Sequence, residues 1–135
     1  MGNAKILVVD DEQDMRIFVS TVVETLGFEP MVAKDGVDAL EKARLNPPAL
    51  VILDVMMPKI DDGIQTYRQF KTNPGLATIP IIMLSAIAKK TFLHSIKMLS
   101  PQQGPQLPEP EAYMEKPPDA NELSRLITGL LPSGS

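Results

Sequence analysis

Three carboxylates follow directly on short apolar runs in this sequence, and clustered carboxylates can hold a metal ion or attack a phosphorus atom. Asp54 follows the run Leu50–Leu53. Asp10 and Asp11 follow the run Ile6–Val9. Such runs, bounded by breakers, are typical of strands buried on both faces of a parallel sheet. Ligands bind at the carboxyl ends of such strands, so the pattern predicts three carboxylates at one functional edge.

Three carboxylates this close together require a compensating charge. Two unit charges about 4 Å apart repel by roughly 4 kcal/mol at an effective dielectric constant near 20. A site made only of oxygen ligands suits a hard divalent cation, and few carboxylates plus water favour Mg²⁺. Asp54 could then act as the nucleophile that forms an aspartyl-phosphate. Lys116 and Ser85, each at the end of a later predicted strand, could bind the phosphoryl oxygens.

Each of these residues has a simpler explanation when it is taken alone. Asp10, Asp11 and Ser85 precede predicted helices and could be helix caps. Asp54 could simply end a strand, and Lys116 could be a solvated surface residue. Five such residues at four separate strand ends are harder to attribute to chance, so their combination carries the functional hypothesis.

The predicted elements that would position these residues alternate between strand and helix. Strands are expected at Lys5–Val9, Phe28–Ala33, Leu50–Leu53, Ile79–Leu84 and Ala112–Glu115. Helical spacing of apolar residues predicts helices around 15–26, 37–45, 64–70, 89–99 and 123–131. This alternation predicts right-handed βαβ units. The expected fold is α/β, a flavodoxin-like doubly wound five-stranded parallel sheet in the order 2-1-3-4-5 with helices on both faces.

Length and composition limit the possible classes of protein. The 135 residues suit one domain, expected over residues 1–131, with 132–135 as a disordered tail. A formal net charge of −4 without a basic block argues against direct nucleic-acid binding. We found no cysteine, no room for a signal peptide and no apolar run of membrane-spanning length, so a soluble cytoplasmic protein without membrane contact is expected.

From about Lys5 to Leu131 the chain resembles a receiver domain of the two-component response regulators. The motifs that carry the resemblance are Leu7-Val8-Val9-Asp10-Asp11, Leu53-Asp54-Val55-Met56-Met57-Pro58, Ser85-Ala86 and Lys116-Pro117. The resemblance implies a phosphorelay in which Asp54 accepts a phosphoryl group from the phosphohistidine of a sensor histidine kinase or phosphotransfer protein. The phosphorylated domain would then shift between conformations that bind a downstream protein target, with a homodimer as one possible outcome.

The resemblance also implies a role for each site residue. Asp10, Asp11, Asp54 and the backbone carbonyl of Met56 would bind Mg²⁺, while Ser85 and Lys116 would hold the phosphoryl group. Tyr113 matches the aromatic switch that turns inward when the hydroxyl residue, here Ser85, moves towards the phosphate. An ordinary strand aromatic explains Tyr113 equally well from the sequence.

The chain departs from the family pattern near the site and near the predicted partner surface. The segment from Pro58 to Gly63 is one residue longer than usual, which could reshape the loop beside the phosphate. The proline-rich stretch Ser100–Glu111 lengthens the connection before the fifth strand and is predicted to be an exposed, mobile loop. Apolar Met56 and Ile87 occupy positions where water-directing residues can occur, which favours a longer-lived phosphate.

Other functions compete with the phosphoacceptor. An adaptor that works without phosphorylation would explain the altered stretch before the fifth strand, but the intact acid set argues against it. A Mg²⁺-dependent phosphohydrolase of the haloacid-dehalogenase type would need an acid where Met56 stands. His94 is expected to be a surface residue rather than a phosphocarrier. We therefore expect no enzyme activity beyond phosphotransfer to the chain itself and slow autodephosphorylation.

Overall fold

The fold is known from a computed structural model that describes residues 4–57, 59–98 and 106–131. Five parallel strands form one sheet in the order β2-β1-β3-β4-β5, so the predicted α/β topology is confirmed. The strands are β1 (Lys5–Val9), β2 (Glu29–Ala33), β3 (Leu50–Leu53), β4 (Ile81–Ser85) and β5 (Ala112–Glu115). The expected tail, 132–135, lies outside the described residues.

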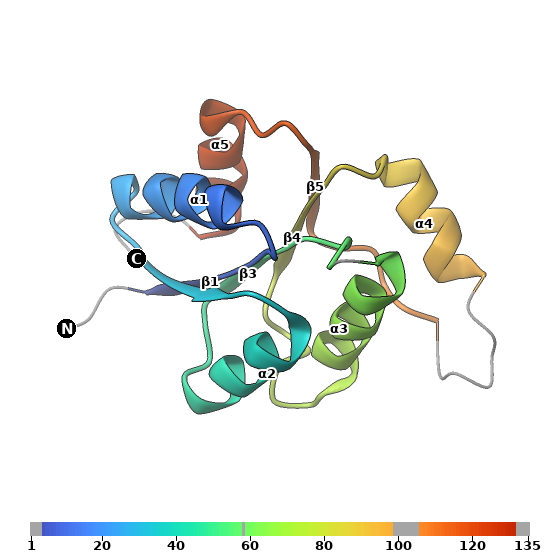
Figure 1. Cartoon of the computed structure of the whole chain (residues 1–135). Helices are drawn as coiled ribbons and strands as arrows, with labels where there is room; N and C mark the ends of the chain where they lie inside the picture. The colour runs from blue at the N-terminus through green and yellow to red at the C-terminus, as the bar shows by residue number, and fades with distance from the viewer. Residues whose placement is uncertain (1–3, 58, 99–105, 132–135) are drawn as a thin grey trace.

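Helices cover both faces of the sheet (Figure 1). One face carries α1 (Gln13–Thr25) and α5 (Ala120–Leu130), and the other carries α2 (Gly36–Leu45), α3 (Ile60–Thr72) and α4 (Lys89–Lys97). Alternate strand residues feed two separate apolar cores, as expected for strands buried on both sides. None of the helices in the described part of the chain is both long and apolar enough to cross a membrane.

The register of the sheet brings the strand ends together. Val9 pairs with Leu53, so the residues that follow them, Asp10 and Asp54, leave the sheet side by side. Ser85 closes β4 and pairs with Glu115 at the end of β5. The five strand-end positions singled out in the sequence therefore converge on one edge of the sheet.

Helix α3 begins earlier than the sequence pattern predicts. We expected Asp61, Asp62 and Gly63 to form a loop, but all three lie in the first turn of the helix. Carboxylates are favourable there because they face the unpaired N–H groups and the positive end of the helix dipole. The Asp62 carboxylate accepts a hydrogen bond from the Lys59 N–H at 3.3 Å. The extra residue of this segment is thus followed by a helix rather than by a longer loop.

Residues 106–111 of the proline-rich stretch form no helix or strand and are mostly exposed, as predicted, but Leu107 and Pro110 are buried and attach the segment to the core. Leu107 is only 4% exposed and belongs to the core. The hydroxyl of buried Tyr67 in α3 donates to the Pro108 carbonyl at 2.6 Å. Glu111 accepts from Lys71 at 2.9 Å and from the Ile81 N–H at 2.7 Å. Contacts with side chains of α3, rather than the local composition, therefore fix the position of this segment. Residues 100–105 of the predicted loop lie outside the described residues.

We expect Glu111→Gln to cost about 1–2 kcal/mol of unfolding free energy at pH 7, because it leaves the Lys71 ammonium, whose side chain is 4% exposed, without its carboxylate. Burial alone would raise the pKa of Glu111, but hydrogen bonds from Lys71 and the Ile81 N–H outweigh it and lower that pKa. The stabilisation is therefore present above the unfolded value near 4.5 and is lost as the pH falls through the folded value. Urea unfolding at several pH values measures it.

The matched control is Asp38→Asn, which removes the solvent-exposed ion pair with Lys42 and should cost less than about 0.5 kcal/mol. Amide exchange should also quicken in residues 106–111 of the Glu111→Gln variant. An equal cost for the two substitutions would show that the Glu111 contact does not hold the segment.

Candidate functional site

The site is built on the carboxyl ends of β1 and β3. Asp10 and Asp54 are the first residues after these strands, and each is only 3% exposed. Their backbones are tied to neighbouring strands, because the Asp10 N–H donates to the Ala33 carbonyl and the Asp54 N–H to the Val9 carbonyl. The sheet thus fixes two buried carboxylates beside each other.

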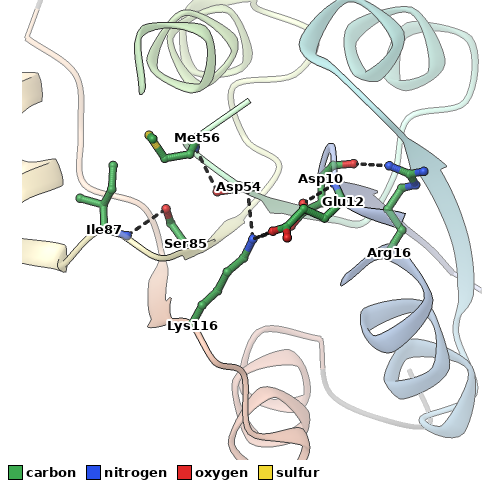
Figure 2. Close-up of polar contacts among 8 residues, drawn as sticks. All are labelled: Asp10, Glu12, Arg16, Asp54, Met56, Ser85, Ile87 and Lys116. Carbon is green, nitrogen blue, oxygen red and sulfur yellow. Dashed lines mark hydrogen bonds and ion pairs between the residues drawn. The ribbon is translucent and has the colours of Figure 1, made fainter. Parts of the chain in front are cut away.

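Lys116 reaches these carboxylates from the end of β5, the edge strand of the sheet (Figure 2). It follows β5, and its Nζ lies 3.1 Å from Asp10 Oδ2 and 3.3 Å from Asp54 Oδ2. The same nitrogen lies 2.9 Å from Glu12 Oε1. One ammonium group therefore bridges three carboxylates, and its side chain is only 12% exposed.

Backbone groups hold the other oxygens of the two buried carboxylates. The Met56 N–H donates to Asp54 Oδ1 at 3.0 Å, and the Glu12 N–H donates to Asp10 Oδ1 at 2.9 Å. The Arg16 guanidinium donates to the backbone carbonyl of Asp10 at 2.7 Å. The two N–H bonds fix the orientation of the carboxylates, and the Arg16 contact holds the Asp10 backbone. This role of Arg16 was not identified from the sequence.

Burial and charge act in opposite directions on the acidic groups. Burial raises the pKa of both Asp10 and Asp54, and the hydrogen bonds from backbone N–H groups and the nearby Lys116 offset part of that effect. For Lys116, burial would lower the pKa, but Glu12, Asp54 and Asp10 outweigh it and raise that pKa. Lys116 therefore stays charged, while the two buried carboxylates are costly to ionise without a further cation.

The acidic residues fit a hard divalent cation. One carboxylate oxygen from each of Asp10, Asp11, Glu12 and Asp54 lies within 4.8 Å of the others. Asp11 is exposed, so the cluster opens to solvent and leaves room for water ligands. Oxygen donors with open positions are the arrangement that Mg²⁺ prefers. The structure thus brings together the three carboxylates predicted from the sequence and adds Glu12.

Glu12 was not singled out from the sequence as a site residue. It stands at the N-cap position of α1, but its side chain makes no capping hydrogen bond and instead contacts Lys116. The signal in the sequence was the run of three acids Asp10-Asp11-Glu12. Nothing in that run specified a partner 104 residues away.

The predicted switch residues lie on either side of the loop after β4. Ser85 is fully buried, and its Oγ accepts a hydrogen bond from the Ile87 N–H at 3.3 Å. The hydroxyl of half-buried Tyr113 donates to the Ile87 carbonyl at 2.6 Å, and its ring packs 5.7 Å from that of Phe92. Burial raises the pKa of Tyr113 to about 12, so the hydroxyl remains a donor. Both residues thus contact the backbone of Ile87.

Two further predictions stand apart from the acid cluster. Met56 is fixed next to Asp54 through its N–H, while the metal-binding role of its carbonyl stays a prediction. His94 is exposed on α4, in agreement with the expectation of a surface residue.

Sequence comparisons relate the chain to response regulators. The family model described as the response regulator receiver domain matches residues 6–100. The alkaline phosphatase synthesis transcriptional regulatory protein PhoP of Bacillus subtilis is 34% identical over 129 residues, which cover 96% of this chain and 49% of PhoP. Protein PilG of Pseudomonas aeruginosa is 37% identical over 82 residues, or 61% of this chain and 60% of PilG. The chain thus spans less than two thirds of each of these relatives.

Solved structures show the same similarity over most of the chain. The chemotaxis response regulator CheY4 of Vibrio cholerae superposes with a TM-score of 0.78 at 26% identity, covering 96% of this chain and 99% of that protein. The receiver domain of the Francisella response regulator 1452 gives a TM-score of 0.75 at 28% identity, covering 95% of this chain and 96% of that domain.

Proposed function

Because this chain belongs to the receiver domains of response regulators, we propose that it takes a phosphoryl group onto Asp54 and signals through the resulting change of conformation. The observation that carries the proposal is the ion pairing of one ammonium group, that of Lys116, with both buried carboxylates, Asp10 and Asp54. The donor would be the phosphohistidine of a sensor histidine kinase or of a phosphotransfer protein.

In the proposed transfer, a carboxylate oxygen of Asp54 forms a bond to phosphorus as the phosphorus–nitrogen bond of the donor breaks. The electron pair of the broken bond stays on the leaving imidazole, which takes up a proton, and Asp54 becomes an acyl phosphate. The chain is then both the phosphoryl acceptor and the catalyst of the transfer, and the phosphodonor is the other reactant. The Met56 N–H and Lys116 favour the ionised carboxylate that this attack requires, because their bonds lower the pKa that burial raises.

Lys116 and Ser85 are placed to bind the phosphoryl oxygens. Lys116 already contacts Asp54 Oδ2, so its positive charge lies next to the atom that would bear the phosphoryl group. The Ser85 hydroxyl accepts from the Ile87 N–H and hydrogen-bonds the Asp54 carboxylate, whose pKa it helps to lower, so it lies where it could donate to a phosphoryl oxygen on Asp54. If Ser85 turned towards the phosphate, its bond to the Ile87 N–H would change. A shift of Ile87 would in turn alter the hydrogen bond from the Tyr113 hydroxyl to the Ile87 carbonyl.

The acid cluster would hold Mg²⁺ through Asp10, Asp11, Asp54 and the Met56 carbonyl. The bound ion would supply positive charge that offsets the developing charge on the phosphoryl oxygens. Without it, the carboxylates of Asp11 and Glu12, both exposed, would repel an anionic donor.

We expect the chain to gain one phosphoryl group from a small phosphodonor such as phosphoramidate when Mg²⁺ is present, and none when EDTA removes the ion. Mg²⁺ alone should also raise the melting temperature, since a ligand of the folded state stabilises that state. Intact mass spectrometry with rapid quenching measures the first effect, and thermal unfolding measures the second.

Absence of the phosphoryl adduct at saturating Mg²⁺ would contradict the proposal. That result would favour the second candidate, an adaptor that binds its partner without phosphorylation. The packed segment 106–111, which is anchored on α3, would then be the first surface to test for partner binding.

A further inference from the structure

Glu12 makes the shortest contact of the three carboxylates around Lys116. Its Oε1 lies 2.9 Å from Lys116 Nζ, against 3.1 Å for Asp10 and 3.3 Å for Asp54. It is also the only exposed member, since 63% of its side chain is accessible, compared with 4% and 3% for the two aspartates. Glu12 is therefore the solvent-exposed partner of the Lys116 ammonium, and Figure 2 shows the two groups in contact.

We propose that Glu12 is a positioning residue that holds the Lys116 ammonium in the unphosphorylated domain and competes with the phosphoryl group for it. The inference rests on the proposed phosphoacceptor function. It assigns Glu12 two effects of opposite sign. Its charge favours a divalent cation in the cluster, while its contact with Lys116 slows phosphorylation of Asp54.

The local backbone leaves the Glu12 side chain free to contact Lys116. Its extended conformation at the start of α1 and the bond from its N–H to Asp10 Oδ1 fix the main chain, while its side chain makes no capping bond. The carboxylate is thus free of α1 and bonded to Lys116 across the site. The Glu12 side chain therefore does not perform the capping role that Ser, Thr, Asp or Asn usually performs at this position.

A purely stabilising role does not account for the contact. Exposed ion pairs contribute roughly 0–1 kcal/mol to folding, and Lys116 keeps two buried carboxylate partners without Glu12. Glu12 also adds a fourth negative charge within 4.8 Å of three others. We therefore assign the contact two effects: it fixes the position of the Lys116 ammonium, and it increases the negative charge around that group.

Competition predicts a specific change when the phosphoryl group arrives. The ammonium must turn its donors towards phosphoryl oxygens, and each donor held by Glu12 has to be released first. The Glu12 charge also repels the anionic donor. Removing the charge should therefore speed phosphorylation at saturating Mg²⁺ by about 2- to 5-fold, the range set by the strength of an exposed ion pair. The same change should weaken Mg²⁺ binding by a similar factor.

Two substitutions separate the charge of Glu12 from its reach. Glu12→Gln removes the charge, so both the affinity for Mg²⁺ and the hold on Lys116 should fall. Glu12→Asp keeps the charge but shortens the side chain, so Mg²⁺ affinity should stay within about 2-fold of the original while phosphorylation still becomes faster. Asp14→Asn is the matched control, because Asp14 is an exposed acid of the same helix outside the cluster.

The experiment has three readouts on the whole chain. Calorimetric titration with MgCl₂ gives cation affinity, intact mass gives the rate of phosphorylation by phosphoramidate, and ¹⁵N spectra of the Lys116 ammonium report how firmly it is held. We expect faster exchange of the ammonium protons in Glu12→Gln and Glu12→Asp, and no change in Asp14→Asn.

The proposal is overturned if Glu12→Gln matches Asp14→Asn in cation affinity, rate and ammonium exchange. A faster rate in Glu12→Gln but not in Glu12→Asp would assign the effect to repulsion of the donor and overturn the competition for Lys116. If the original chain takes up no phosphoryl group, the proposed function fails. The ammonium spectra then still decide whether Glu12 holds Lys116.

Discussion

Replacing Asp54 with asparagine should abolish phosphorylation and at the same time make the domain more stable. The amide cannot act as the nucleophile, so the phosphoryl adduct should disappear at every Mg²⁺ concentration. The amide also removes a buried negative charge beside Asp10, and Lys116 retains Asp10 and Glu12 as partners. We expect a gain of about 1 kcal/mol at pH 7, or roughly 3–6 °C in melting temperature for a domain of this size.

The gain should depend on pH in a definite direction. Burial raises the folded-state pKa of Asp54, which means that the ionised carboxylate is less favourable in the folded domain than in the unfolded chain. Its cost to the fold is absent below the unfolded value near 3.8 and grows as the pH rises through the folded value. The advantage of Asp54→Asn should therefore be largest at neutral pH and shrink in acid. Thermal unfolding across this range, in EDTA, measures it.

The control is Asp119→Asn, which changes an exposed N-cap residue of α5 into one that caps equally well. It should leave both phosphorylation and stability almost unchanged. Continued labelling of Asp54→Asn would place the phosphoacceptor elsewhere. A loss of stability at pH 7 would show that the ion pair with Lys116 outweighs the cost of burying the carboxylate.

The strands and their acidic ends could be predicted because the sequence marks them locally. Leu50–Leu53 and Ile6–Val9 are continuous apolar runs, and each meets its carboxylate without an intervening residue. Parallel pairing then leaves little freedom in where Asp10 and Asp54 lie. The sheet order and the carboxylate pair follow from the same pattern.

Contacts made by single exposed or isolated side chains could not be predicted in this way. Glu12 and Lys116 meet only because the ends of β1 and β5 reach the same edge of the sheet, and no periodicity in the sequence pairs them. The segment around Leu107 was predicted to be exposed because prolines prevent regular structure there. Proline content gives no information about a tyrosine in another helix, and it is Tyr67 that anchors this segment.

The start of α3 shows how a single glycine connects the helix to the phosphoacceptor loop. Gly63 lies in the first turn of α3, against the backbone of buried Val55, the residue after Asp54. A Cβ at position 63 would lie 1.9 Å from the Val55 carbonyl oxygen and 2.3 Å from its Cα. These are backbone atoms, which cannot rotate away as a flexible side chain could.

We therefore expect Gly63→Ala to destabilise the domain by about 3 kcal/mol, at the upper end of the usual cost of overpacking. Alanine normally stabilises a helix relative to glycine by roughly 0.5–1 kcal/mol, so the expected sign is opposite to that of helix propensity. Moving Val55 should also displace the Met56 N–H from Asp54 Oδ1, which would slow phosphorylation. Urea unfolding and the rate of labelling by phosphoramidate measure the two effects.

Gly129→Ala is the matched control within the same chain. Gly129 also lies in a helix, α5, but a Cβ there would meet nothing within 4 Å. This substitution should raise stability by up to about 1 kcal/mol and leave phosphorylation unchanged, because only helix propensity acts. If Gly63→Ala were as harmless as Gly129→Ala, α3 could slide away from Val55 without cost. Val55 is the residue before Met56, so a shift of Val55 would also move the Met56 N–H. If Gly63→Ala left the rate of phosphorylation unchanged, the position of this N–H would not be required for the chemistry at Asp54.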